Sequence, residues 1–194
     1  IYVPAAKPKG IVQLIHGFGE HSRRYLHMIA HFTEADYIVT ADDHVGHGKT
    51  AMMNNTWGNW GDKGYRTMTE DEHTLMNLTK EKFPNLPYFL FGHSMGSFIA
   101  RKYAEKFGTE IAGAVFCGTS GNNPAAGIGS LLAGLIASVK GARHRSDFLN
   151  KMSFGSYNKR ITNPRTDFDW LTRDNTVVDA YIEDKYCGFL FTAV

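Results

Sequence analysis

Short apolar runs alternate with segments of helical periodicity along this chain. The apolar runs predict strands at about residues 11–16, 36–41, 87–91 and 111–117. Between and after them, apolar residues spaced three and four apart predict helices at about residues 22–34, 67–83 and 97–107. Strands that alternate with helices are typical of a parallel sheet covered by helices, so the expected fold class is α/β.

The helical periodicity also predicts which side chains face the core. In the helices at 67–83 and 97–107, the inward residues are expected to be Met68, Leu75, Leu78, Phe83, Phe98, Ile99 and Phe107. Gly108 is expected to cap the second of these helices. The acidic run Glu70–Glu72 lies near the N-terminus of the first, where the helix dipole favours negative charge. Cys117 ends an apolar strand and is expected to be a small core residue.

The segment Gly92-His93-Ser94-Met95-Gly96 has the pattern G-x-S-x-G between a predicted strand and a predicted helix. This is the context of a nucleophile elbow, a sharp turn that holds its central serine in a strained conformation above the sheet. Gly92 and Gly96 are expected where the strand and helix backbones nearly touch. Ser94 is therefore the candidate nucleophile, and the side chain of His93 is expected to point away from it.

A second motif, His16-Gly17-Phe18-Gly19, directly follows the first predicted strand. Acyl transfer to a serine needs two backbone N–H groups that face the developing oxyanion. The candidates are the N–H groups of Met95 and Phe18, with Gly17 and Gly19 allowing the loop to bend towards the site. On its own this motif predicts only a turn, and its pairing with the elbow favours the functional interpretation.

These motifs resemble three sequence blocks of monoacylglycerol-lipase-like and lysophospholipase-like serine hydrolases. The blocks are His16–Ser22 followed by Arg24-Tyr25, then Asp43–Gly48, then Gly92–Gly96. The resemblance covers about residues 8–121 well. It implies an α/β-hydrolase core over residues 1–121, with a central and mostly parallel sheet, and a helical cap over residues 122–194. It also implies a lipid ester with one acyl chain as the substrate.

The same resemblance implies that part of the catalytic machinery lies outside this chain. In the family, the serine is followed along the chain by an acid and then by the histidine that takes its proton. The last histidine here is His144, inside the expected cap. We therefore expect an incomplete fold that lacks the acid and the base, is poorly active alone, and associates through two bare sheet edges.

Local histidines are weak substitutes for the missing base. His16 and His47 are expected to shape loops, and His21 and His44 lie nearer the expected pocket mouth. A metal site built from Asp42, Asp43, His44 and His47 is disfavoured, because these residues share a glycine-containing loop without the H-E-x-x-H spacing. Asp43 and His47 are instead expected to bond to backbone groups and pin this loop. No metal or cofactor is expected.

Residues 125–139 form an almost wholly apolar run, and Lys140, Arg143 and Arg145 follow it. Two interpretations stay open. The run is either a buried helix or a cap helix whose apolar side receives an acyl chain and contacts a membrane surface. It is too short to span a bilayer, which takes about 20 residues.

Composition adds only general limits. A net charge of +2 and no basic face interleaved with aromatic residues give no reason to expect nucleic acid as a partner. Two cysteines, Cys117 and Cys187, do not make a disulfide framework. With no signal peptide in the sequence, the expected location is the cytoplasm.

Three functions remain open at this point. The first is a carboxylic-ester hydrolase. The second is a peptidase or amidase of the proline-iminopeptidase type, which an acidic cluster in the cap would favour. The third is a non-catalytic module that keeps the elbow as scaffold. Glu20, His21 and Arg24 either hold the oxyanion loop in place, which is the favoured interpretation, or bind a polar head group.

Overall fold

The computed structural model describes residues 1–61, 63–122 and 125–193. Its sheet contains four parallel strands in the order β2-β1-β3-β4, and every predicted strand is present to within two residues. The strands are β1 (Gly10–Ile15), β2 (Tyr37–Ala41), β3 (Tyr88–His93) and β4 (Gly113–Cys117). The α/β fold class is therefore confirmed.

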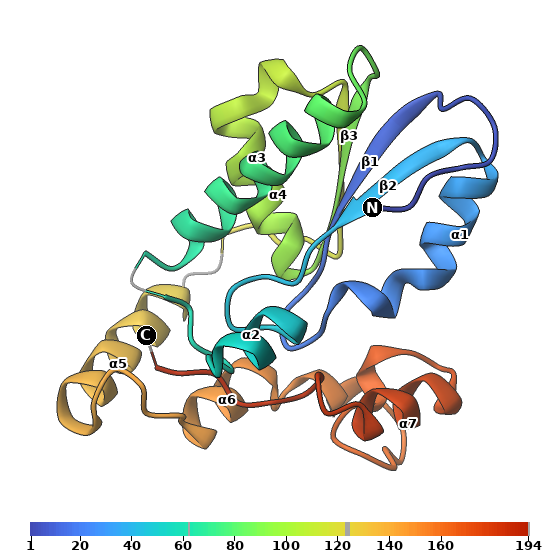
Figure 1. Cartoon of the computed structure of the whole chain (residues 1–194). Coiled ribbons are helices and arrows are strands. Elements are labelled where there is room, and N and C mark those ends of the chain that lie inside the picture. The colour runs from blue at the N-terminus through green and yellow to red at the C-terminus, as the bar shows by residue number, and fades with distance from the viewer. Residues whose placement is uncertain (62, 123–124, 194) are drawn as a thin grey trace.

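Helices cover both faces of this sheet (Figure 1). On one face lies α1 (Leu26–Glu34), preceded by a 3-10 turn at Ser22–Tyr25, and it buries Ile29 against Leu14 and Val39. On the other face lie α3 (Tyr65–Lys82) and α4 (Met95–Phe107). The larger core lies between these two helices and the sheet, around Ile11, Met76, Leu90, Ile99 and Tyr103.

A short helix that the sequence pattern did not predict, α2 (Gly48–Asn54), follows the loop after β2. Only Gly48 and Ala51 of its seven residues are buried, so it has no apolar stripe to reveal it.

A layer of helices lies below the carboxyl ends of the strands (Figure 1). It contains α5 (Ala125–Lys140), α6 (Asp147–Phe154), α7 (Asn175–Glu183) and 3-10 turns at Tyr157–Arg160 and Asp169–Leu171. Backbone hydrogen bonds join this layer to the loops above it, from Gly188 N to Gly19 O at 2.9 Å and from Thr192 N to Gly58 O at 2.9 Å. None of the helices in the described ranges has the length and apolar character needed to cross a membrane.

Several burial predictions for the core helices were wrong. Leu78 of α3 is exposed, because the inward positions of this helix are Met68, Glu72, Met76 and Thr79. The helix begins at Tyr65, so Glu72 lies two turns into it, beyond the first turn in which the dipole favours negative charge, and it is fully buried. Phe98 of α4 is also largely exposed.

Gly108 is the C-cap of α4, as predicted, with a right-handed φ of −60° that leads into a 3-10 turn at Gly108–Glu110. The prediction for the end of β4 needs correction. Cys117 is exposed and not a core residue, because the second half of β4 has no covering element in the described part of the chain.

The structure of α5 decides against one of the two interpretations of residues 125–139. Its apolar side chains Ile128, Leu131, Leu135 and Val139 are exposed, so the interpretation as a buried helix is wrong.

The two edges of the sheet differ. At the β2 edge, Tyr2 forms an antiparallel bridge with Val39, with hydrogen bonds of 2.8 and 2.9 Å, so this edge is partly covered and not bare as expected. At the β4 edge, no further strand pairs with β4 among the residues that the structure describes.

Candidate active site

The turn between β3 and α4 is sharp and strained. Ser94 has φ 52° and ψ −117°, a region that non-glycine residues rarely adopt, and such a conformation costs about 1–3 kcal/mol. Hydrogen bonds hold it on both sides. Ser94 N donates to Cys117 O at 2.9 Å, and Ser97 donates to Ser94 O from its backbone N at 2.9 Å and its hydroxyl at 2.6 Å. The predicted strand, turn and helix are confirmed.

The two glycines of the turn are required by close packing. A Cβ atom on Gly96 would lie 2.1 Å from the carbonyl oxygen of Ile15, and one on Gly92 would lie 2.4 Å from that of Gly96. No real Cβ approaches backbone atoms so closely, so α4 rests directly on the ends of β1 and β3. This contact brings the turn at Ser94 against the loop that follows β1.

That loop carries the two glycines and the phenylalanine predicted to form the oxyanion hole. Gly19 has φ 64°, and a Cβ atom on Gly17 would lie 2.6 Å from Glu20 Oε1. Phe18 and Met95 line one cavity together with Ser94. Within the described ranges, neither the Phe18 N–H nor the Met95 N–H donates a hydrogen bond to the protein. Their role as oxyanion donors stays a prediction.

Glu20 anchors this loop from inside. Its buried Oε1 accepts hydrogen bonds from Gly17 N at 2.6 Å and from the Tyr25 hydroxyl at 2.5 Å, and Arg24 pairs with its other oxygen. Burial alone would raise the pKa of Glu20, but hydrogen bonds from His93 and Tyr25 and the charge of Arg24 lower it to about 2. The carboxylate therefore holds the loop, as the favoured interpretation of Glu20 and Arg24 expects.

The ring of His93 belongs to the same group. Its Nδ1 lies 2.8 Å from the Tyr25 hydroxyl and 3.5 Å from Glu20 Oε1. These contacts fit the expectation that this side chain turns away from Ser94.

The segment around α7 holds the outer side of the loop. The Tyr181 hydroxyl donates to Gly19 O at 3.0 Å, and the ring centroids of Phe191 and Phe18 are 4.0 Å apart. His21, itself buried, lies 2.8 Å from Asp184, 163 residues away in the sequence. Sequence patterns gave no sign of these contacts, because nothing local in either segment reflects a partner so far along the chain.

Ser94 opens onto an apolar cavity of about 590 Å³. Its lining includes Phe18, Trp60, Met68, Phe98 and Phe154. Among the described residues that line it, the only charged side chain is Lys102. Phe98 was predicted to lie in the core, but its ring is part of this cavity lining instead. A second and more polar cavity of about 780 Å³ lies beside α6 and shares Phe18 and Phe154 with the first.

No histidine is in place to activate Ser94. All nine histidines of the sequence lie in the described ranges, and none forms a hydrogen bond with the Ser94 hydroxyl there. His16, His44 and His47 are buried. Both ring nitrogens of His16 and of His44, and Nδ1 of His47, contact backbone atoms or a buried carboxylate, whereas His47 Nε2 has no hydrogen-bond partner in the described structure.

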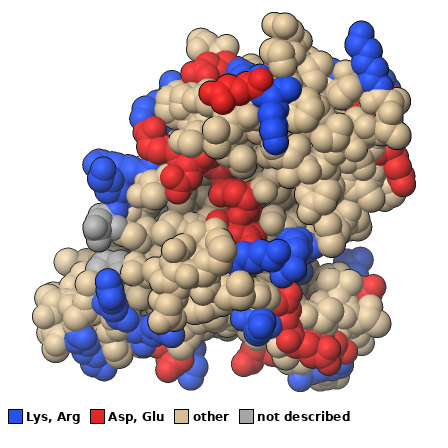
Figure 2. All heavy atoms as spheres, in the orientation of Figure 1, with Lys and Arg blue, Asp and Glu red and all other residues tan. Residues whose placement is uncertain are grey.

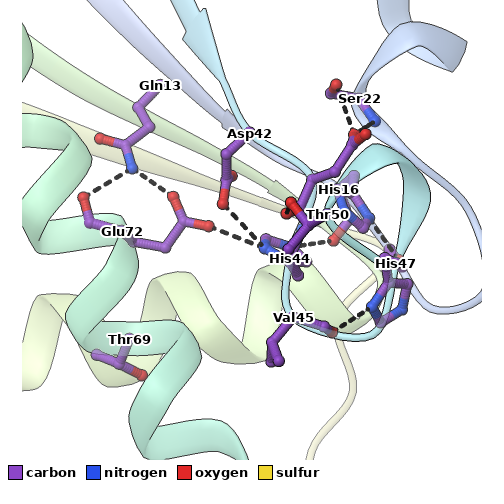
Figure 3. Close-up of polar contacts among 12 residues, drawn as sticks. Gln13, His16, Ser22, Asp42, His44, Val45, His47, Thr50, Thr69 and Glu72 are labelled. Carbon is purple, nitrogen blue, oxygen red and sulfur yellow. Dashed lines mark hydrogen bonds and ion pairs between the residues drawn. The ribbon is translucent and has the colours of Figure 1, made fainter. Parts of the chain in front are cut away.

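The loop after β2 is pinned as predicted (Figure 3). Asp43 accepts hydrogen bonds from Ser22 N at 2.9 Å and Lys49 N at 2.8 Å, and His47 Nδ1 lies 2.9 Å from Val45 O. The ring of His47 makes an edge contact with that of His44, with centroids 5.9 Å apart, while the Asp43 carboxylate bonds to Ser22 and Lys49.

Asp42 and His44 meet a third side chain instead, that of Glu72 on α3 (Figure 3). Sequence reasoning missed this cluster because Glu72 stands in a charged run that is typical of a solvated helix face. The only available signal was its spacing of four residues from Met68 and from Met76, which places it on the inward face.

Several known proteins resemble this chain in sequence and in fold. A model of the family described as serine aminopeptidase, S33, matches residues 6–193. The crystal structure of a thermostable carboxyl esterase from Bacillus coagulans in complex with glycerol superposes with a TM-score of 0.91 and 48% identity, over 98% of this chain and 61% of that one. The monoacylglycerol lipase of Mycolicibacterium smegmatis is 30% identical over 184 residues, which are 95% of this chain and 58% of the lipase.

Human monoglyceride lipase is 34% identical over 119 residues, covering 58% of this chain and 35% of its own length. The chain thus spans less than two thirds of each of these relatives.

Proposed function

Because this chain belongs to the serine aminopeptidase S33 family and has the α/β-hydrolase fold, we propose that it carries the nucleophile and the oxyanion hole of a carboxylic-ester hydrolase. The proposed substrates are lipids with a single acyl chain, of the monoacylglycerol or lysophospholipid type. The observation that carries the proposal is the strained Ser94 at the mouth of an apolar cavity.

The proposed reaction has two acyl-transfer steps. Ser94 Oγ attacks the ester carbonyl carbon, and the N–H groups of Phe18 and Met95 stabilise the negative charge that develops on the carbonyl oxygen. The alcohol leaves with a proton, and an acyl ester forms on Ser94. Water then attacks this acyl-enzyme and releases the fatty acid. Since these donors belong to the backbone, the loop contacts of Glu20 determine whether the Phe18 N–H faces the site.

The cavity lining supports an acyl chain over a peptide amine as the bound group. An aminopeptidase needs a negative group to receive the substrate amine, whereas the only charged side chain in the described lining of the Ser94 cavity is the cationic Lys102. The relatives named as lipases and esterases point in the same direction. The peptidase alternative is therefore disfavoured.

A fluorophosphonate probe and a panel of monoacylglycerols test the proposal in the complete protein that carries this chain. We expect Ser94→Ala to abolish both labelling and hydrolysis, while Ser120→Ala, at an exposed serine, leaves both unchanged. Unaltered hydrolysis in Ser94→Ala would contradict the proposal and support the non-catalytic alternative. Preference for aminoacyl amides over monoacylglycerols would support the peptidase.

We further propose that the chain alone labels far more slowly than the complete protein. The reason is that none of its nine histidines contacts the Ser94 hydroxyl in the described structure. Equal labelling rates for the two would show that a histidine of this chain reaches Ser94.

The exposed face of α5 is proposed to contact a lipid surface. Ile128, Leu131, Leu135 and Val139 are all exposed at helical spacing, and several Lys and Arg side chains gather over α5 and α6 (Figure 2). This combination of apolar and basic groups suits an anionic bilayer surface. Leu131→Asp is expected to weaken sedimentation with anionic vesicles, and Ser130→Asp, on a neighbouring face, serves as the control. Equal loss in both variants would leave only a charge effect and refute the apolar contact.

A further inference from the structure

Three side chains meet in the core beside the oxyanion loop (Figure 3). Asp42 and His44 come from the loop after β2, and Glu72 comes from α3. His44 is 2% exposed and Glu72 is fully buried. The His44 ring stacks on that of His16, with centroids 3.9 Å apart. None of these four side chains takes part in the acyl transfer proposed above, so the cluster needs its own explanation.

Both ring nitrogens of His44 face oxygen atoms that accept hydrogen bonds. Nδ1 lies 3.2 Å from Glu72 Oε1 and 3.7 Å from Asp42 Oδ2, and Nε2 lies 3.2 Å from the carbonyl oxygen of His16. Beside an ionised Glu72, a neutral imidazole, which has one N–H, would have one nitrogen lone pair facing buried oxygen lone pairs. An imidazolium has an N–H for each side.

The orientation of Glu72 is fixed from its other end. Gln13 Oε1 accepts a hydrogen bond from the Tyr88 hydroxyl at 2.6 Å, which directs its amide nitrogen to Glu72 Oε2 and to Glu72 O. Apart from the ion-pair contact between Glu72 Oε1 and His44 Nδ1, neither Glu72 Oε1 nor Asp42 Oδ1 has a hydrogen-bond partner in the described structure. A positive charge on His44 therefore compensates the negative charge of these buried carboxylate oxygens.

The surrounding charges agree with this assignment. The titratable groups that interact electrostatically with His44 come from its own loop, from the loop after β1 and from α3; they are Asp42, His47, His16, Asp71 and Glu72. Burial and the charge of His44 lower the pKa of His47 to about 3 and that of His16 well below 6.5, so both rings are neutral. Burial also opposes a charge on His44, but Asp42 and Glu72 outweigh it and raise its pKa. Burial and the charge of Asp42 raise the pKa of Glu72 to about 7.

The carbonyl group that His44 contacts, that of His16, lies at the start of the oxyanion loop. In the peptide between His16 and Gly17, the oxygen faces His44 Nε2 and the N–H donates to Glu20 Oε1 at 2.6 Å. The next residue is Phe18. A Cβ atom on Gly96 would lie 2.6 Å from the same carbonyl oxygen, so the elbow helix also rests on this peptide.

We propose that His44 is a buried imidazolium held by Asp42 and Glu72, and that it positions the His16–Gly17 peptide from which the loop presents the Phe18 N–H. It is a positioning residue, because it touches no substrate. Its protonation stands independently, whereas its effect on catalysis rests on the proposed function.

The protonation is tested on this chain with histidine labelled with ¹⁵N, by NMR from pH 5 to 9. We expect His44 to show two protonated ring nitrogens at neutral pH. In Glu72→Gln its ring should lose a proton at lower pH than in the unaltered chain, and Glu81→Gln, at an exposed position of the same helix, should leave it unchanged. A bare ring nitrogen at neutral pH in the unaltered chain would overturn the proposal.

The same three side chains form a possible donor set for a divalent cation. A cation would replace the proton on Nδ1. Loss of that N–H signal on adding one equivalent of Zn²⁺ would overturn the proposal in favour of a metal centre, whereas an unchanged spectrum supports the imidazolium.

The positioning role is tested by kinetics in the complete protein. We expect Glu72→Gln to lower kcat roughly 10- to 100-fold with little change in KM, since a displaced donor affects the transition state more than binding. In Glu72→Gln, the fall of kcat with rising pH should begin at a lower pH than in the unaltered protein, because His44 loses its proton at a lower pH there. Unchanged kcat alongside a deprotonated His44 would refute positioning. An unaltered protein without esterase activity would instead refute the proposed function, and the NMR result would still decide the protonation.

Discussion

Replacing Glu20 by glutamine tests the anchoring of the oxyanion loop most directly. The folded pKa of about 2 lies below the ordinary 4.5, because hydrogen bonds from His93 and Tyr25 and the charge of Arg24 outweigh burial. The difference, at about 1.4 kcal/mol per pH unit, amounts to about 3 kcal/mol of stability. Since the pKa is lowered on folding, this stability is present above pH 4.5 and is lost as the pH falls towards 2.

The assay is urea unfolding of this chain, followed by tryptophan fluorescence between pH 7 and 2.5. Glu20→Gln should be about 3 kcal/mol less stable than the unaltered chain at pH 7, and the difference should shrink below pH 4.5, where the unaltered carboxyl gains its proton. Glu81→Gln, at an exposed position, should show no difference at any pH. A deficit for Glu20→Gln that stays constant with pH would refute the electrostatic reasoning and leave only a packing effect.

Further predictions concern the backbone at the elbow and the open edge of the sheet. Gly96→Ala should lower the free energy of unfolding by about 3 kcal/mol or prevent folding, because its Cβ meets a backbone oxygen. Gly127→Ala, which has open space around it in α5, should raise the free energy of unfolding by up to about 1 kcal/mol. Thermal unfolding compares the two variants, and equal effects would contradict the close contact at Gly96. Ser94→Gly should raise stability by about 1 kcal/mol by removing the strain at φ 52°, and a lower melting temperature would count against that strain. Val115→Lys on exposed β4 should reduce self-association in analytical ultracentrifugation, and an unchanged sedimentation profile would exclude this edge as the contact.

Local features of the fold were predictable from the sequence because local sterics produce them. The four strands follow from continuous apolar runs, of which the run of β1 is buried along its whole length. The turn at Ser94 follows from its two flanking glycines, since only they permit the approach of α4 to β1 and β3. The pinning of the loop by Asp43 and His47 was predictable because their bonds span only a few residues or one neighbouring loop.

Burial at the boundaries of the core was less predictable. Leu78 and Cys117 follow apolar patterns, yet both are exposed, because periodicity identifies an apolar stripe but not whether another element covers it. The exposed apolar face of α5 has the same origin. An apolar pattern predicts a buried face only when the chain supplies a layer to pack on it.

The sequence by itself determined the order of strands and helices, the strained serine turn and the glycine loop beside it, because each depends on backbone geometry within a few residues. Only the tertiary structure decided which charges are buried together. Glu72 lies in a polar run and His44 in a loop motif, and neither pattern predicts that the two side chains are in contact. Their pairing depends on how α3 crosses the sheet, and the low polarity of the core makes a compensating charge necessary once they meet there.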